Sequence, residues 1–215
     1  MLVMLSLFTA VSYLSVYIIG FKVSFLTFDV KNVFITVAAM LYGPVPGVVV
    51  SLLAALLELL LYSTTGFYGF IMNFLSSASF AFVAGWFYRR HKTMVGSYLA
   101  LTLATVMSTS LMMVANLFIT PFYMGGSMTD VAKMIPTLLF PFNLIKCVVN
   151  AALVLVLYKP ISLVLTRAGM IKKEGGIARY LTGKTAITLL IAAVLIAASM
   201  TVFFLVLGGK IDFGT

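Results

Sequence analysis

Long apolar runs, separated by short polar segments, limit what this chain can fold into. A helix needs about 20 apolar residues to cross the hydrocarbon core of a bilayer, and only 9% of the residues here are charged. The runs do not alternate between apolar and polar residues, which argues against a β-barrel. The sequence therefore predicts an all-α polytopic membrane protein. The predicted spans are Leu2–Gly20, Asn32–Leu41, Val48–Tyr62, Phe67–Tyr88, Val95–Ile119, Thr137–Tyr158 and Ala186–Leu207.

The runs divide into a main unit and one additional helix. Residues 1–167 hold the first six runs and are predicted to form a six-helix membrane domain. Residues 168–184 are polar and basic, and we interpret them as a cytoplasmic linker. Residues 185–215 are predicted to form an additional transmembrane helix with a short tail.

Two segments between the runs are predicted to be irregular. The sequence "YGPVPG", Tyr42–Gly47, is expected to form a corner because prolines and glycines interrupt regular structure. The residues from 120 to 136, which contain "TPFYMGGSMTD" and Lys133, are expected to form a longer loop. The run before the corner is shorter than a bilayer crossing requires, so it must be tilted, extended through the corner or buried by its neighbours.

The basic residues predict the orientation. Nine of the fourteen Lys and Arg residues lie in "RRHK", Arg89–Lys92, or in the segment Lys159–Lys184. Cytoplasmic loops carry such an excess. If all seven runs cross, the N-terminus is cytoplasmic; if the short second run does not cross, the N-terminus is external. The net charge of +9 is thus explained by topology, and no nucleic-acid partner is expected.

Enzyme chemistry finds little support in the sequence. There is no phosphate-binding loop of the type Gly-x-x-x-x-Gly-Lys-Ser/Thr. His91 is the only histidine and Cys147 the only cysteine, so neither a soft-metal site nor a Ser/His/Asp triad is expected. We expect no enzymatic activity and no cofactor.

The sixth run contains three polar residues that membrane helices rarely tolerate. Asn143, Lys146 and Asn150 are spaced i, i+3 and i+7, which places them on one helix face. A charged lysine in hydrocarbon costs a few kcal/mol or more, so it must face a partner or a cavity. One interpretation is a contact between helices, with Lys146 bound to Glu58 or to a carbonyl. The other is a polar ligand pocket.

Further polar and aromatic residues also bear on the choice between these two interpretations, and some favour the pocket more strongly than others. Asn116 and Asn143 lie near the outer ends of their spans, and an amide offers both donors and acceptors, as a flat heterocycle requires. Asn73 is as compatible with a contact between helices as with a ligand. Aromatic residues near the outer face, Phe28 and Tyr123 among them, form either an interfacial belt or a stacking surface.

Three stretches resemble a known family. The stretch "FDVKNVFITVAAMLYGPVPGVVVSLL" resembles the loop and helix pair of the S components of energy-coupling-factor vitamin transporters. The stretches "NLFITPFYMG" and "LLFPFNLIKCVVNAALVLVLYKPIS" resemble the riboflavin-specific S component in particular. The resemblance covers about residues 1–167.

The resemblance implies a six-helix membrane subunit that binds riboflavin from outside with high affinity. The subunit then associates with a transmembrane coupling subunit and two ATPases, and riboflavin is the transported ligand. In that family, side chains matching Asn116, Asn143 and Lys146 hold the flavin ring. The first loop, here with Phe28 and Asp29, covers the ligand.

The sequence departs from the family in two places. Many riboflavin-specific members carry a Glu and a Lys after the Gly-Pro corner, where this chain offers Ser51, Ala54 and Glu58. The seventh run lies outside the usual six-helix core and has no assigned role. Two other functions stay open: a membrane-embedded structural or assembly subunit, and a self-sufficient secondary transporter of another small solute.

Overall fold

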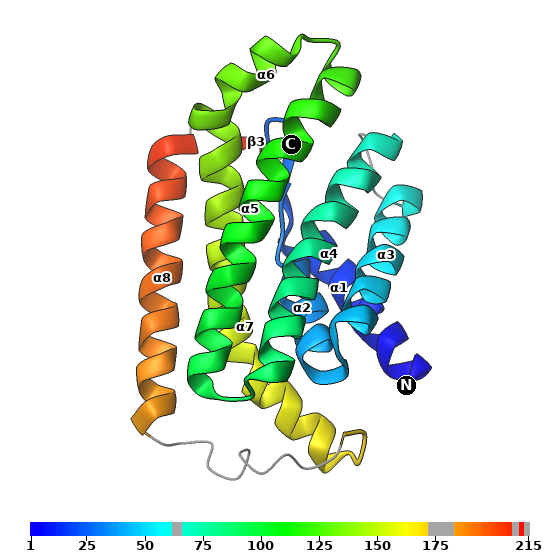
Figure 1. Ribbon diagram of the computed structural model, residues 1–215, viewed down its shortest axis with the longest axis vertical. Helices are drawn as coiled ribbons and strands as arrows, with labels where there is room; N and C mark the ends of the chain where they lie inside the picture. Colours follow the sequence, from blue (N-terminus) through cyan, green and yellow to red (C-terminus); the bar gives the residue numbers. More distant parts are fainter. Residues whose placement is uncertain (62–65, 172–182, 208–210, 213–215) are drawn as a thin grey trace.

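The computed structural model describes residues 1–61, 66–171, 183–207 and 211–212 as a helical bundle (Figure 1). The α-helices are α1 (Leu2–Ile19), α2 (Lys31–Tyr42), α3 (Pro44–Leu61), α4 (Gly66–Arg90), α5 (Met94–Met124), α6 (Met128–Met134), α7 (Phe140–Arg167) and α8 (Gly183–Leu207). A π-helical turn, η1 (Ile135–Leu139), joins α6 to α7. The strands are β1 (Phe21–Val23), β2 (Leu26–Phe28) and β3 (Ile211–Asp212). The prediction of an all-α polytopic membrane fold is confirmed.

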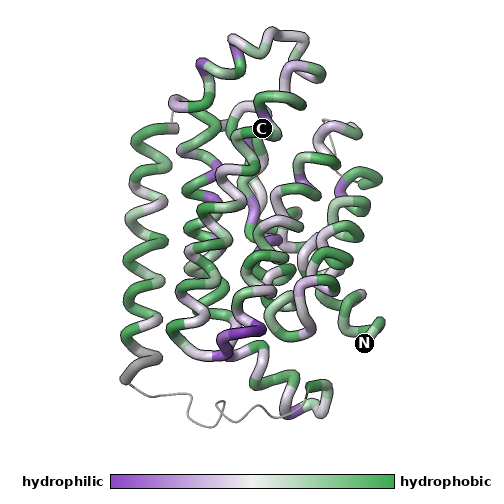
Figure 2. Tube along the Cα trace, in the orientation of Figure 1, coloured by the Kyte–Doolittle hydropathy of each residue, from purple (hydrophilic) through white to green (hydrophobic). Residues whose placement is uncertain are grey.

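The helices that are long enough to span a membrane carry apolar residues along most of their length (Figure 2). Within the described residues these are α1, α3, α4, α5, the α6–α7 segment and α8. Helix α2 is the exception, with twelve residues. Nine of those twelve residues are buried, so α2 is covered by its neighbours and does not face lipid along its length.

Close packing around α2 depends on two glycines. A side chain on Gly47 of α3 would collide with the Cβ of Ala39 on α2. A Cβ on Gly85 of α4 would lie 2.8 Å from the Ala39 carbonyl oxygen. Lipid provides no hydrophobic driving force for helix association, so membrane helices depend on close van der Waals packing. Small residues allow that close approach. These two glycines therefore let both α3 and α4 approach the same alanine of α2 closely.

The corner after α2 is tighter than the sequence predicted. Helix α2 ends at Tyr42, Gly43 adopts a φ of +113°, and α3 begins directly at Pro44. A positive φ suits glycine because it has no Cβ. Pro44 and Pro46 fit the first turn of α3 because the first four N–H groups of a helix have no partner within the helix.

The expected loop of residues 120–136 is largely helical, and that prediction was wrong. Helix α5 continues through Pro121 to Met124, and the Pro121 carbonyl accepts a hydrogen bond from Gly125 N at 3.0 Å. Helix α6 then begins with a capping box between Ser127 and Asp130. Proline near a helix end removes only one hydrogen bond, so it does not stop the helix here.

The basic residues and the hairpin β1–β2 lie toward opposite ends of the bundle. The N-terminus, the connection between α4 and α5, and the end of α7 lie at the same end of the bundle (Figure 1). The basic residues Arg89 and Arg90 finish α4 at this end, and Arg167 finishes α7. Of the predicted linker 168–184, residues 172–182 lie outside the described residues.

Candidate substrate-binding site

A short hairpin follows α1 and reaches into the bundle. Strands β1 and β2 pair antiparallel, with Phe21 opposite Phe28 and Val23 opposite Leu26. Ser24 and Phe25 form the turn, and Ser24 has a φ of 57°. The family resemblance implies that this first loop covers the ligand; its strand structure was not predicted.

The polar face of α7 holds the end of the hairpin. Lys146 Nζ lies 2.8 Å from Asp29 Oδ2 and donates to the Thr27 carbonyl oxygen at 2.9 Å. One turn further along, Asn150 Nδ2 donates to the Asp29 carbonyl oxygen at 3.1 Å. Lys146 therefore binds a carbonyl, as one sequence interpretation expected, but its acidic partner is Asp29 and not Glu58.

Glu58 forms its ion pair with a different lysine, Lys31. Lys31 Nζ donates to both Glu58 carboxylate oxygens, at 2.7 and 2.8 Å, and Asn73 Nδ2 donates to Oε2 at 2.7 Å. Lys31 Nζ also lies 3.8 Å from Asp29 Oδ2. The four charged groups thus form one chain in which the signs alternate: Lys146, Asp29, Lys31, Glu58. Buried charges are costly unless each is paired and hydrogen-bonded, and this chain pairs all four.

Asp29 stays ionised at neutral pH. Its burial alone would raise the pKa of the carboxyl group, since low dielectric disfavours the charged form. The ammonium groups of Lys146 and Lys31 outweigh that effect and hold the pKa of Asp29 below its usual range. The hairpin is therefore fastened to α7 by the ion pair between Asp29 and Lys146.

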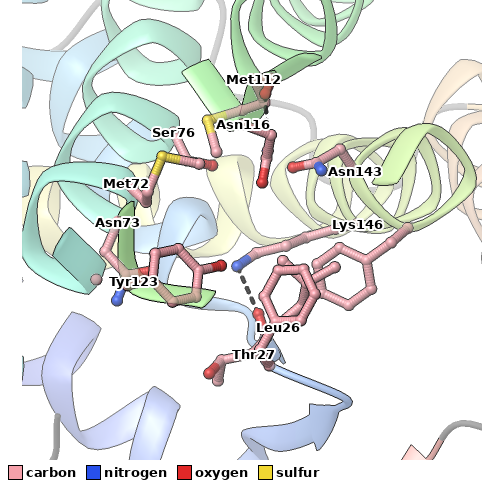
Figure 3. A pocket seen from close by; sticks show the side chains of 13 residues that line it. Leu26, Thr27, Met72, Asn73, Ser76, Met112, Asn116, Tyr123, Asn143 and Lys146 are labelled. Atoms are coloured by element: carbon pink, nitrogen blue, oxygen red, sulfur yellow. Dashed lines mark hydrogen bonds between the residues drawn. The ribbon is translucent and has the colours of Figure 1, made fainter. Parts of the chain in front are cut away.

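A cavity lies between the hairpin and helices α4, α5 and α7 (Figure 3). The space between its walls, together with the solvent at its open mouth, amounts to about 550 Å³. Its walls are formed by Phe25, Leu26, Thr27, Gly69, Met72, Asn73, Ser76, Met112, Asn116, Tyr123, Phe142, Asn143 and Lys146.

The cavity gathers most of the residues that the sequence proposed for the site. Five of them lie in its wall: Asn73, Asn116, Tyr123, Asn143 and Lys146. The other two, Phe28 and Asp29, lie outside it.

Phe28 and Asp29 support the wall from behind. Phe28 packs against Phe142 of α7, with ring centroids 6.2 Å apart, and Asp29 is fully buried against Lys146. Glu58 is also outside the wall, and a hydrogen bond joins it to the wall residue Asn73.

The two amides of the wall are oriented by their own helices. Asn116 Nδ2 donates to the Met112 carbonyl at 2.7 Å, and its Oδ1 accepts from Thr120 at 3.0 Å. Asn143 Nδ2 donates to the Leu139 carbonyl at 2.8 Å. Each amide keeps a second N–H, and the Asn143 oxygen has no donor among the described residues. Both residues line the cavity, and both amides have hydrogen-bonding capacity left over.

Comparison with known proteins identifies the family. The family of substrate-specific components of ECF transporters matches residues 1–158. The chain belongs to this family. A relative named "Riboflavin transporter RibU", from Staphylococcus aureus (strain TCH60), is 29% identical over 175 residues, which cover 77% of this chain and 92% of the relative. The chain is thus a multi-pass membrane protein and a component of a transporter.

A solved structure supports the same fold. The chain is similar to the protein in "Structure and mechanism of the S component of a bacterial ECF transporter", with a TM-score of 0.65 and 28% identity. The similarity covers 77% of this chain and 97% of that protein. The family match ends at residue 158, so α8 lies beyond the matched residues of this ECF component.

Several wall residues were missed by sequence reasoning, and helical spacing could have found some of them. Met112 is four residues before Asn116 on α5, and Ser76 is three residues after Asn73 on α4. Residues three or four apart share a helix face, so each polar candidate also indicates which neighbours belong to the same wall. The hairpin residues Phe25, Leu26 and Thr27 had no such signal, since no turn glycine marks the hairpin.

The described part of the chain contains no group of three or more His, Cys, Asp and Glu side chains that could hold a metal ion. Cys147 is buried beside Lys146 in sequence and is a free thiol. What the cavity wall offers chemically is recognition: neutral amides, one ammonium group, hydroxyls and aromatic rings.

Proposed function

We propose that this ECF component binds riboflavin in the cavity and mediates its uptake. The observation that carries this proposal is the convergence of Asn116, Asn143 and Lys146 on one cavity that the hairpin covers. The relative named as a riboflavin transporter supports the same ligand. Riboflavin is here the transported ligand and not a cofactor.

The wall suits a flavin ring chemically. The pyrimidine-like edge of the flavin presents carbonyl oxygens on either side of an N–H group. Asn116 and Asn143 can donate to the oxygens, and the free Asn143 oxygen can accept from the N–H. Phe25, Tyr123 and Phe142 provide aromatic surface for the faces and edges of the ring.

Lys146 links the ligand to the hairpin. Two of its N–H groups bind Asp29 and the Thr27 carbonyl, and the third has no acceptor among the described residues. Donation of that third N–H to riboflavin would make one ammonium group hold both the ligand and its cover. Thr27 and Ser76 also line the cavity and add polar residues to its wall.

The family and the distribution of basic residues support a proposal for the orientation and the partners. We infer that the N-terminus is cytoplasmic, because the basic ends of α4 and α7 lie at the same end of the bundle as the N-terminus. The hairpin and cavity then open toward the outside. The partners would be a transmembrane coupling subunit and two ATPase subunits of an ECF module, with no nucleic acid involved.

An absorbance spectrum of the purified protein tests the ligand most directly. Bound riboflavin would colour the preparation yellow, and calorimetric titration after its removal should give tight, stoichiometric binding. A structural or assembly subunit would neither copurify with a flavin nor bind one. A self-sufficient secondary transporter would take up solute in vesicles that lack the ATPase module, whereas this component should not.

A further inference from the structure

Helix α8 is fixed to the bundle by a few residues of one face. Thr188, Ala192 and Phe203 are buried, and their spacings of four and eleven residues place them on the same side of the helix. The Thr188 and Tyr98 hydroxyls are 2.6 Å apart, which ties the start of α8 to α5. Most other described side chains of α8 are exposed and apolar, as expected for contact with lipid. Figure 1 shows α8 alongside α7.

Phe203 reaches the hairpin from α8. Its side chain is 0% exposed. Its ring lies 5.2 Å from that of Phe28 and 5.6 Å from that of Phe21, both in edge-to-face geometry. Phe28 in turn contacts Phe142, which is part of the cavity wall. A continuous aromatic path therefore runs from α8 through the hairpin to the cavity.

The backbone provides a second attachment to the same hairpin. Strand β3, which follows α8, pairs antiparallel with β1, so that the strand order is β2–β1–β3. Lys22 is opposite Asp212 and Val23 is opposite Ile211. A two-stranded hairpin with strands of three residues has little stability of its own. The hairpin is therefore held from two sides, by α7 through Asp29 and by the segment after residue 183.

We propose that Phe203 is a positioning residue that keeps the hairpin closed over the cavity, so that α8 sets how long the ligand stays bound. This inference rests on the proposed function only in its choice of ligand. The hairpin forms part of the cavity wall together with α4, α5 and α7, so a ligand leaves more easily when the hairpin moves away from these helices. Removing the Phe203 ring deletes the aromatic contacts that oppose this movement, while it leaves every residue of the cavity wall in place.

The test compares Phe203→Ala with Leu205→Ala in the full chain, reconstituted in lipid nanodiscs. Leu205 is on the same helix and is 81% exposed, so its truncation controls for a general effect on α8. Each protein is loaded with radiolabelled riboflavin and chased with unlabelled riboflavin. Loss of two aromatic pairs should speed dissociation roughly tenfold in Phe203→Ala. Leu205→Ala should match the wild type.

A second measurement reports on the hairpin without any ligand. Ser24 at the hairpin turn is exposed and can be changed to cysteine and spin-labelled, because the native Cys147 is buried. In ligand-free protein, Phe203→Ala should make the label more mobile and Leu205→Ala should not. This measurement tests whether Phe203 holds the hairpin in place, even if riboflavin is not the ligand.

The outcomes separate cleanly. Faster dissociation together with a more mobile label, in Phe203→Ala alone, supports the proposal. A folded Phe203→Ala protein with wild-type dissociation or wild-type label mobility overturns it. If Phe203→Ala does not fold, Phe203→Leu takes its place: it keeps apolar volume but removes the edge-to-face contacts, and a smaller change in both measurements is expected. Wild-type values in Phe203→Leu as well would overturn the proposal.

Discussion

The two walls of the cavity are built in different ways. The helical wall, from α4, α5 and α7, carries amides that are oriented by hydrogen bonds within their own helices, as for Asn116 and Asn143. The hairpin wall has strands of three residues and is held in place by side chains of other elements. Side chains on helices are placed more rigidly than those on loops. The helical wall is thus suited to recognition, and the hairpin wall to opening and closing.

The two walls meet at Lys146. Its side chain belongs to the helical wall, yet two of its hydrogen bonds go to the hairpin. Asp29 belongs to the hairpin segment, yet it is part of the buried chain of charges that continues to Lys31 and Glu58. Substitutions at these residues should therefore affect both walls, whereas substitutions of the amides should affect one.

The largest effect is expected for Asp29→Ala. Loss of this carboxylate leaves Lys146 buried without an acidic partner, while Lys31 keeps Glu58. Removing one member of a buried ion pair typically lowers the free energy of unfolding by about 3–5 kcal/mol. Thermal unfolding in detergent should show a clear drop in Tm, and riboflavin binding should be lost or severely weakened.

Asp29→Asn is the matched control for that change. It keeps the volume and an acceptor oxygen but removes the charge, so the drop in Tm should be smaller than for Asp29→Ala. A wild-type Tm in Asp29→Ala would show that the charged link between the hairpin and α7 does not stabilise the protein.

The second prediction concerns Lys146→Ala. Hydrogen bonds from charged groups contribute about 1.5–3 kcal/mol, so riboflavin affinity should fall about ten- to a hundredfold. Because Lys146 also binds the hairpin, a spin label at residue 24 should become more mobile in the ligand-free protein. Calorimetry and the label together test both roles. Unchanged affinity in the folded variant would remove Lys146 from the ligand site and leave it a structural lysine.

The third prediction concerns the two amides of the helical wall, whose loss should affect ligand binding but not the hairpin. Asn143→Ala and Asn116→Ala should each weaken riboflavin binding about five- to tenfold, the effect of losing a neutral hydrogen bond. Neither should change the mobility of a label at residue 24, since neither amide bonds to the hairpin. Increased label mobility in Asn143→Ala would mean that the two walls are not separate in the way the hydrogen bonds indicate.

Much of the helical wall could be predicted from the sequence, because helical spacing is a local property. The spacing of Asn143, Lys146 and Asn150 placed them on one face of α7, and hydropathy located α8 beyond the six-helix domain. The partners of the buried charges could not be predicted in the same way. Glu58 and Lys31 are 27 residues apart, and Lys146 and Asp29 are 117 apart. Which lysine meets which acid depends on how the helices pack.

The hairpin wall was largely missed, and the reason is local chemistry. A two-residue hairpin turn is usually recognised by Asn-Gly, Asp-Gly or a leading glycine. Here the turn is Ser24-Phe25, and the strands on either side are only three residues long. The contact between Phe28 and Phe203 could not be predicted either, since an aromatic residue before Asp29 gives no indication that a helix 175 residues later will cover it.

The smallest effect is expected at the hairpin turn itself. Ser24 has a φ of 57°, and it is the only non-glycine residue of the described chain with a positive φ. With a positive φ at the first turn residue only, the turn has the geometry in which glycine is preferred. The strain of an L-residue in the left-handed region destabilises the turn by about 1–2 kcal/mol. Glycine avoids this strain, but ordering its freer backbone on folding costs about 0.5–1 kcal/mol more than for alanine. Ser24→Gly should therefore favour the closed hairpin by at most about 1 kcal/mol and slow riboflavin dissociation less than about fivefold.

Ser24→Ala is the control, because it keeps the backbone strain at this position. Riboflavin should dissociate from it at the wild-type rate. Faster dissociation from Ser24→Gly would indicate that flexibility of the turn, rather than its strain, controls how readily the hairpin wall opens.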